Sequence, residues 1–129
     1  MTRTVIDRQQ FLQPKPRKRI DVPLPEFGNG SVVPVWGMTA KEWTAFQAEQ
    51  QGKDGKPNAK AKIVRERLAI ACCKDDDGKP LFTSDDIQAI GDVAAGVIER
   101  IVNAALEVSG ITESDVESLA KNSEETQAA

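Results

Sequence analysis

The stretch from Cys73 to Ile87 holds the residues of this 129-residue chain best suited to chemistry, and it reads CKDDDGKPLFTSDDI. Its five aspartates could bind a calcium ion or act as general acids and bases. With Gly78 as the invariant glycine of a calcium loop, an acid is required at position 73 and a glutamate at position 84. The chain has Cys73 and Ser84 there. Because no catalytic partner stands nearby either, we expect neither a metal site nor a catalytic site.

The composition argues against an enzyme. The chain has no histidine and no tyrosine, which removes the usual general base, the commonest metal ligand and any histidine-based triad. Its two cysteines, Cys72 and Cys73, are adjacent, and sequence neighbours rarely form a disulfide without strain. No apolar run reaches the length of a membrane span or resembles a secretory signal. We expect no cofactor, no membrane contact and a reducing, cytosolic compartment.

Charge is distributed unevenly along the chain. Residues 1–20 carry six basic residues and one acidic residue, whereas residues 75–129 carry three basic and thirteen acidic residues. Most of the folded surface should therefore repel nucleic acid, and no helix-turn-helix or zinc pattern supports such binding. The basic cluster Arg17, Lys18 and Arg19 could tether an acidic partner or RNA, although a solvated tail is the simpler interpretation. We expect no nucleic-acid partner.

One local pattern, apolar–Thr–x–x–acid–apolar, occurs three times and is typical of a helix start. The threonine can accept from free N–H groups, the acid can reach back to the cap, and the apolar pair can clasp as a hydrophobic staple. The expected cap pairs are Thr39 with Glu42, Thr83 with Asp86, and Thr112 with Asp115. The aspartate-rich stretch is thus interpreted as a joint between two helices, the first of which ends at Gly78.

These starts predict a mainly α fold, a small domain of about four helices. They run from Thr39 to about Gln51, from about Asn58 to Lys74, from Thr83 to about Val108, and from Thr112 to about Lys121. Gly91 and Gly96 lower helix propensity within the third helix and allow either close packing or a bend.

Extended segments precede the first helix. Residues 20–36 alternate apolar and polar side chains around the turn sequence GNGS, which predicts a short β-hairpin or a pair of extended segments. Pro23 and Pro34 confine them to a sheet edge. We expect a flexible basic arm at residues 1–18, a single helical domain at 19–121 and a disordered tail at 122–129.

The third predicted helix carries a wide apolar stripe that includes Val93, Val97 and Ile101. Either this helix is a central strut wrapped by the others, or its surplus face packs on a second subunit or a partner. The sequence leaves both open. These three residues, with Arg17, Lys18 and Arg19 of the arm, are the candidate partner-binding residues.

The layout resembles a known family. A basic arm and a short β segment end in VPVWGMTAKEW, a helical part follows with CCKDDDGKPLFTSDDIQAIGDVAAGVIERIVNAALEVSGI, and an acidic tail contains LAKNSEE. Over about residues 18–125 the chain resembles the tail assembly chaperones of long-tailed, lambda-like bacteriophages, in which a phrase like D–G–x–P–L–F–T joins two helices. The motifs that carry the resemblance include no catalytic residues, and the resemblance implies a protein that acts in the host cell cytoplasm.

The resemblance implies a chaperone that coats the helical tape measure protein, keeps it soluble, helps to bring tail tube subunits to it, and is absent from the finished particle. In the family a longer product, made by ribosomal slippage, often recruits the tube protein, and Lys121-Asn122 can be encoded by a slippery run of adenines. Self-association into rings or spirals is also expected. The alternative functions are a structural tail or connector component of the virion and a small nucleic-acid-binding regulator.

Overall fold

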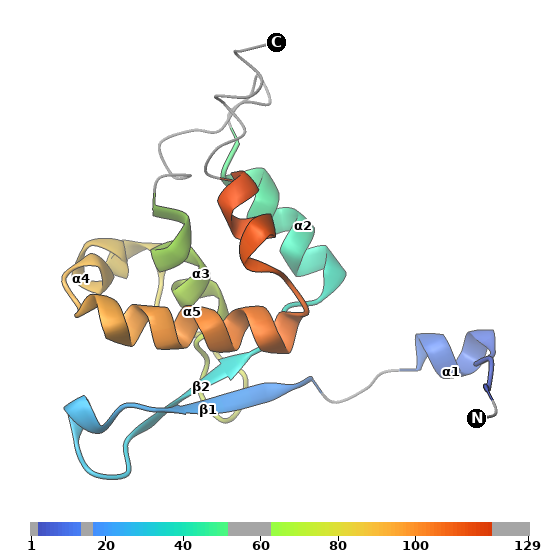
Figure 1. Ribbon diagram of the computed structural model, residues 1–129, viewed down its shortest axis with the longest axis horizontal. Coiled ribbons are helices and arrows are strands. Elements are labelled where there is room, and N and C mark those ends of the chain that lie inside the picture. Colours follow the sequence, from blue (N-terminus) through green and yellow to red (C-terminus); the bar gives the residue numbers. More distant parts are fainter. Residues whose placement is uncertain (1–2, 14–16, 52–62, 120–129) are drawn as a thin grey trace.

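The computed structural model describes residues 3–13, 17–51 and 63–119, and within them the chain forms a mainly α domain with one small hairpin (Figure 1). The elements are α1 (Arg8–Leu12), β1 (Arg19–Pro23), the 3-10 turn η1 (Pro25–Phe27), β2 (Val32–Trp36), α2 (Ala40–Glu49), α3 (Val64–Cys72), the 3-10 turn η3 (Ser84–Asp86), α4 (Ile87–Gly91) and α5 (Ala95–Ser109). Residues 113–119 form a further helix. The predicted class is confirmed, with more helices than the four expected.

The hairpin supplies one wall of the core. β1 and β2 pair antiparallel with Ile20 opposite Val35 and Val22 opposite Val33, and alternation places Val22, Val33 and Val35 on the buried face. The outer edge of β2 is also used, because the Pro34 carbonyl accepts from the Lys74 N–H at 3.2 Å. The predicted hairpin is therefore present, and its edge is joined to the chain that follows α3.

The centre of the domain is α5, which packs against α3 and against both strands. Figure 1 shows it crossing above the hairpin, with α3, α2 and the helix at 113–119 on its other side. Its buried residues are Val97, Ile98, Ile101, Val102, Ala104, Ala105 and Leu106. Gly110, with φ of 68°, ends the helix in the left-handed conformation that glycine adopts without cost.

The prediction of one continuous helix from Thr83 to Val108 is wrong, because the structure divides this stretch into separate helical segments. A 3-10 turn and α4 come first, α4 ends at Gly91, and Ala94 is extended (φ −54°, ψ 136°) before α5 begins. Gly91 gives little support to a continuing helix. Gly96 lies in the first turn of α5, and a Cβ on either glycine would meet no other atom within 4 Å. The break therefore follows Gly91, and neither glycine makes a close contact.

The other predicted boundaries differ less. α2 begins after Thr39 as expected and ends at Glu49. α3 ends at Cys72, two residues early, because Cys73 and Lys74 bridge to Val35 and Pro80. The predicted start at Asn58, the slippery pair at Lys121-Asn122 and the tail at 122–129 lie outside the described residues.

Candidate binding surface

The three predicted helix starts carry local hydrogen bonds. Thr39 Oγ1 accepts from the Glu42 N–H at 3.1 Å, and Glu42 Oε1 accepts from the Thr39 N–H at 2.9 Å. Thr112 and Asp115 repeat this exchange at 3.1 and 2.9 Å. At the start of η3, Asp86 Oδ2 accepts from the Thr83 N–H at 2.8 Å. These side chains hold backbone groups that a helix start leaves free, which gives them a structural role.

In the aspartate run that precedes η3, the first side chain also accepts hydrogen bonds from the backbone. Asp75 Oδ1 accepts from the N–H groups of Asp77 and Lys79, both at 2.9 Å. Gly78 has φ of 82° inside this turn, so it shapes the turn after Cys73 instead of ending a helix directly. Within the described ranges, no group of three His, Cys, Asp or Glu side chains is placed to hold a metal ion.

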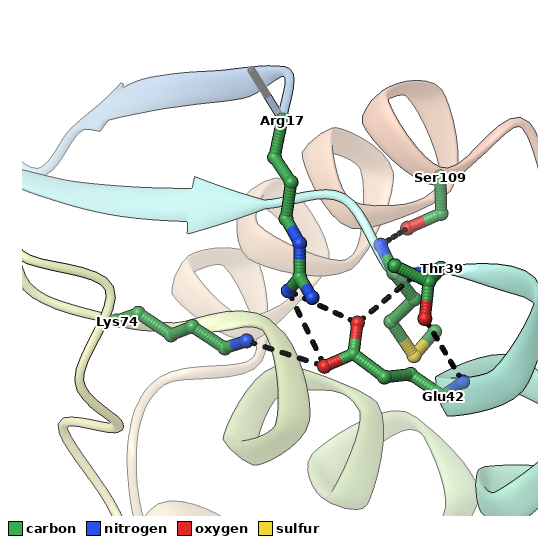
Figure 2. Close-up of polar contacts among 6 residues, drawn as sticks. Arg17, Thr39, Glu42, Lys74 and Ser109 are labelled. Atoms are coloured by element: carbon green, nitrogen blue, oxygen red, sulfur yellow. Dashed lines mark hydrogen bonds and ion pairs between the residues drawn. The ribbon is translucent and has the colours of Figure 1, made fainter. Parts of the chain in front are cut away.

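Glu42 joins three parts of the chain (Figure 2). Its carboxylate lies 3.0 Å from Arg17 Nη1 at the root of the arm and 3.7 Å from Lys74 Nζ after α3. Burial opposes ionisation of Glu42, but the Thr39 N–H and the cations of Lys74 and Arg17 outweigh it, and the pKa of Glu42 lies below its ordinary value. The node fixes where the arm leaves the domain.

The basic cluster predicted as a partner site is largely occupied by this chain's own carboxylates. Arg17 is held by Glu42. Arg19 lies 3.4 Å from Asp21 and 3.0 Å from Asp76, and its guanidinium stands 5.5 Å from the centre of the Trp36 ring. Lys18 is exposed. Arg17 and Arg19 thus anchor the arm instead of presenting a free basic patch.

The apolar stripe of the third predicted helix is not a surface in this chain. Val97 and Ile101 are only 4% and 6% exposed, and Val93 is half-buried. The hairpin covers one side of α5 and α3 covers another. Val97 and Ile101 therefore fit the interpretation in which this helix is a central strut wrapped by the others, and not the one in which it presents a surplus apolar face. Val97 and Ile101 offer no exposed surface in this chain, and partner binding by Val93 stays a prediction.

The exposed apolar side chains lie elsewhere, above all in residues 3–13, which we call the apolar arm. Val5, Ile6, Phe11 and Leu12 are 75%, 53%, 73% and 59% exposed. α1 in this arm is capped by Asp7, whose Oδ1 accepts from the Gln10 N–H at 2.8 Å. The sequence carries a signal for it, because Ile6-Asp7-x-x-Gln10-Phe11 repeats the cap-and-staple pattern found at the other helix starts.

A groove opens between α2, α3 and the segment leading to η3. The α2–α3 groove has a volume of about 270 Å³, apolar walls and two charged side chains. Arg67 Nη2 donates to Glu49 Oε2 at 3.2 Å, while the buried Arg67 Nε has no acceptor within the described chain. Its apolar walls are formed by Phe46, Ile70, Ala71, Pro80 and Phe82.

The cysteines offer no reactive centre. Cys72 and Cys73 are free and buried, and burial raises the pKa of each thiol to about 12. They pack in the core beside Val35, as small apolar side chains do. No helix in the described ranges is long and apolar enough to cross a membrane.

The arrangement is therefore a compact helical scaffold that carries an apolar arm and an apolar groove. No protein-family profile and no curated protein matches the sequence. The fold, however, is similar to that of a phage tail assembly chaperone. The solved structure of the bacteriophage HK97 tail assembly chaperone aligns with a TM-score of 0.52 and 20% sequence identity, over 81% of this chain and 95% of that chain. The resemblance seen in the sequence is confirmed at the level of the fold.

Proposed function

We propose that this chain is a non-enzymatic tail assembly chaperone that binds the tape measure protein and helps to recruit tail tube subunits. The observation that carries the proposal is the fold shared with the HK97 tail assembly chaperone over most of both chains. In this proposal the chaperone leaves before the particle is finished.

Two surface features support a role in binding an apolar client. The apolar arm exposes four large side chains, and the α2–α3 groove offers apolar walls of the size that receives one or two side chains. Each contact is small, so a single one should bind weakly. Many copies along one elongated client would bind it through avidity and still release it when tube subunits arrive.

Co-expression with the tape measure protein tests the proposal. The tape measure protein should be largely soluble when the wild-type chain is present and should aggregate when it is absent. If the soluble fraction is the same in both cases, the proposed function fails. The matched negative control is an unrelated helical protein of similar size and charge, which should not rescue solubility.

Mass spectrometry of purified virions separates a chaperone from a structural component. A chaperone should be depleted from finished particles, whereas abundant peptides of this chain would identify a tail or connector protein.

The longer product is tested in the gene. If the codons for Lys121 and Asn122, with the base before them, cannot re-pair in the −1 frame, recruitment of the tube protein by a frameshifted form has no basis at this position.

A further inference from the structure

The apolar arm has local structure but buries none of its side chains in the described part of the chain. α1 is closed by two hydrogen bonds, from the Gln10 N–H to Asp7 Oδ1 at 2.8 Å and from the Asp7 N–H to Gln10 Oε1 at 3.0 Å. It contributes no buried residue to the described part of the chain. A helix of five residues is marginal by itself in water, and four large apolar side chains on so short a segment are typical of a binding element.

The α2–α3 groove has the complementary character. Its walls are apolar, and Arg67 Nε is a buried donor with no acceptor within the described residues. The arm offers apolar side chains together with acceptors, the Asp7 carboxylate and the Gln9 amide. Ser84 on the groove rim is followed by two aspartates, whereas the apolar arm carries Arg3 and Arg8 against Asp7. The long-range charges of the two surfaces therefore attract each other.

α1 stands apart from α2 and α3, the two helices that line the groove of its own chain (Figure 1). Arg17 is held at Glu42, and α1 stands beyond the end of β1, apart from the helices (Figure 1). Gln13 has extended backbone (φ −65°, ψ 131°), as expected before a proline.

We propose that the apolar arm of one copy docks into the α2–α3 groove of a second copy. This inference rests on the proposed function, because binding to one elongated client is what would bring several copies together. Because the arm and the groove are different surfaces, each copy would use both, and the contacts would join copies head to tail into an open chain or a ring. An eleven-residue arm buries less than a standard interface does, so association should be weak and concentration-dependent.

Sedimentation velocity of the full chain over a range of concentrations tests this interface. The arm variant is Phe11→Ser with Leu12→Ser, and the groove variant is Ala71→Arg, which places a second cation among the groove walls. Each should weaken self-association by about tenfold or more. Phe27→Ser is the matched control, since Phe27 is 63% exposed but lies on η1, outside both surfaces. It should sediment like the wild type.

Mixing the two variants gives the sharpest result. The arm variant keeps an intact groove and the groove variant keeps an intact arm, so the mixture should form dimers and nothing larger. Ser84→Arg, at an exposed position on the groove rim, replaces Ala71→Arg if that variant loses its circular dichroism spectrum.

Three outcomes would overturn the proposal: a wild-type chain that stays monomeric at every concentration, an arm variant that associates like the wild type, and a variant mixture that remains monomeric. If the wild-type chain does not self-associate and the arm variant fails to keep the tape measure protein soluble, the arm binds the client instead of a second copy. Failure of the proposed function is separate, because it is measured as client solubility and not as self-association.

Discussion

Gly37 lies against the backbone of Val108, so closely that a Cβ on Gly37 would stand 2.4 Å from the Val108 carbonyl oxygen. This contact presses the connection between β2 and α2 onto the last turn of α5. The next residue adds a hydrogen bond from the Met38 N–H to Ser109 Oγ at 3.0 Å. Hairpin, α2 and α5 therefore meet at one point where only glycine fits.

Gly37→Ala should destabilise the domain by about 2 kcal/mol, because backbone atoms must move to admit the methyl group. Urea unfolding followed by circular dichroism measures the change. Gly96→Ala is the control, since a Cβ there meets nothing within 4 Å in an exposed turn of α5. It should be neutral or stabilise by about 0.5–1 kcal/mol. Equal effects of the two substitutions would contradict the close contact.

Glu42→Gln should lower stability at neutral pH by no more than about 1 kcal/mol, because the side chain is 38% exposed. The pKa of Glu42 lies below its ordinary value of 4.5 in the folded state. Its ionised form therefore stabilises the fold above the unfolded pKa, and this contribution is lost as the pH falls through the folded pKa. The gap between wild type and variant should close below about pH 4.5 in urea titrations. A gap that stays constant with pH would contradict the ion-pair node, and exposed Glu117→Gln is the control.

The thiols of Cys72 and Cys73 should be unreactive in the folded chain. Burial raises their pKa to about 12, so almost no thiolate exists near pH 8 and reagents cannot reach it. A chromogenic disulfide reagent should modify both rapidly in denaturant and neither, on the same timescale, in buffer. Rapid modification of either thiol in buffer would contradict the packing at the end of α3.

The helix at residues 113–119 is held mainly by apolar burial. Val116 is 1% exposed, and Val116→Ala should cost about 2 kcal/mol. Arg65 also ties this helix to the domain, because it binds Glu99 through two hydrogen bonds of 2.7 and 2.6 Å and also pairs with Glu113. These groups are partly exposed, so Arg65→Met should cost about 1 kcal/mol or less. Urea unfolding of both variants ranks the two effects, and a larger loss for Arg65→Met would contradict this order.

Local patterns predicted where helices begin, because a cap depends on a few neighbouring residues. The spacing of Thr39 with Glu42 and of Thr112 with Asp115 predicts a cap for that reason. The cap formed by Asp7 and Gln10 has the same spacing, but Asp7 stands where the pattern has threonine and Gln10 where it has an acid, so the pattern does not include it. The hairpin was predicted from period-two alternation around a turn.

Tertiary relationships were not readable from the sequence. The stripe that contains Val97 and Ile101 is compatible with one covered face or with several, and only the packing of the hairpin and α3 on α5 decides that it is sealed. The α2–α3 groove joins Phe46, Ile70 and Phe82 from three segments, and no spacing rule brings them together. Charge composition indicated a basic arm but did not show that Arg17 and Arg19 are held by the domain's own carboxylates.

The central claim, that this chain coats a tape measure protein, is tested most directly by sedimentation velocity of the two proteins purified together. We predict that the tape measure protein sediments with several copies of this chain and that the number of bound copies rises to saturation with chain concentration. A tape measure protein that sediments alone at every concentration of this chain would contradict the account.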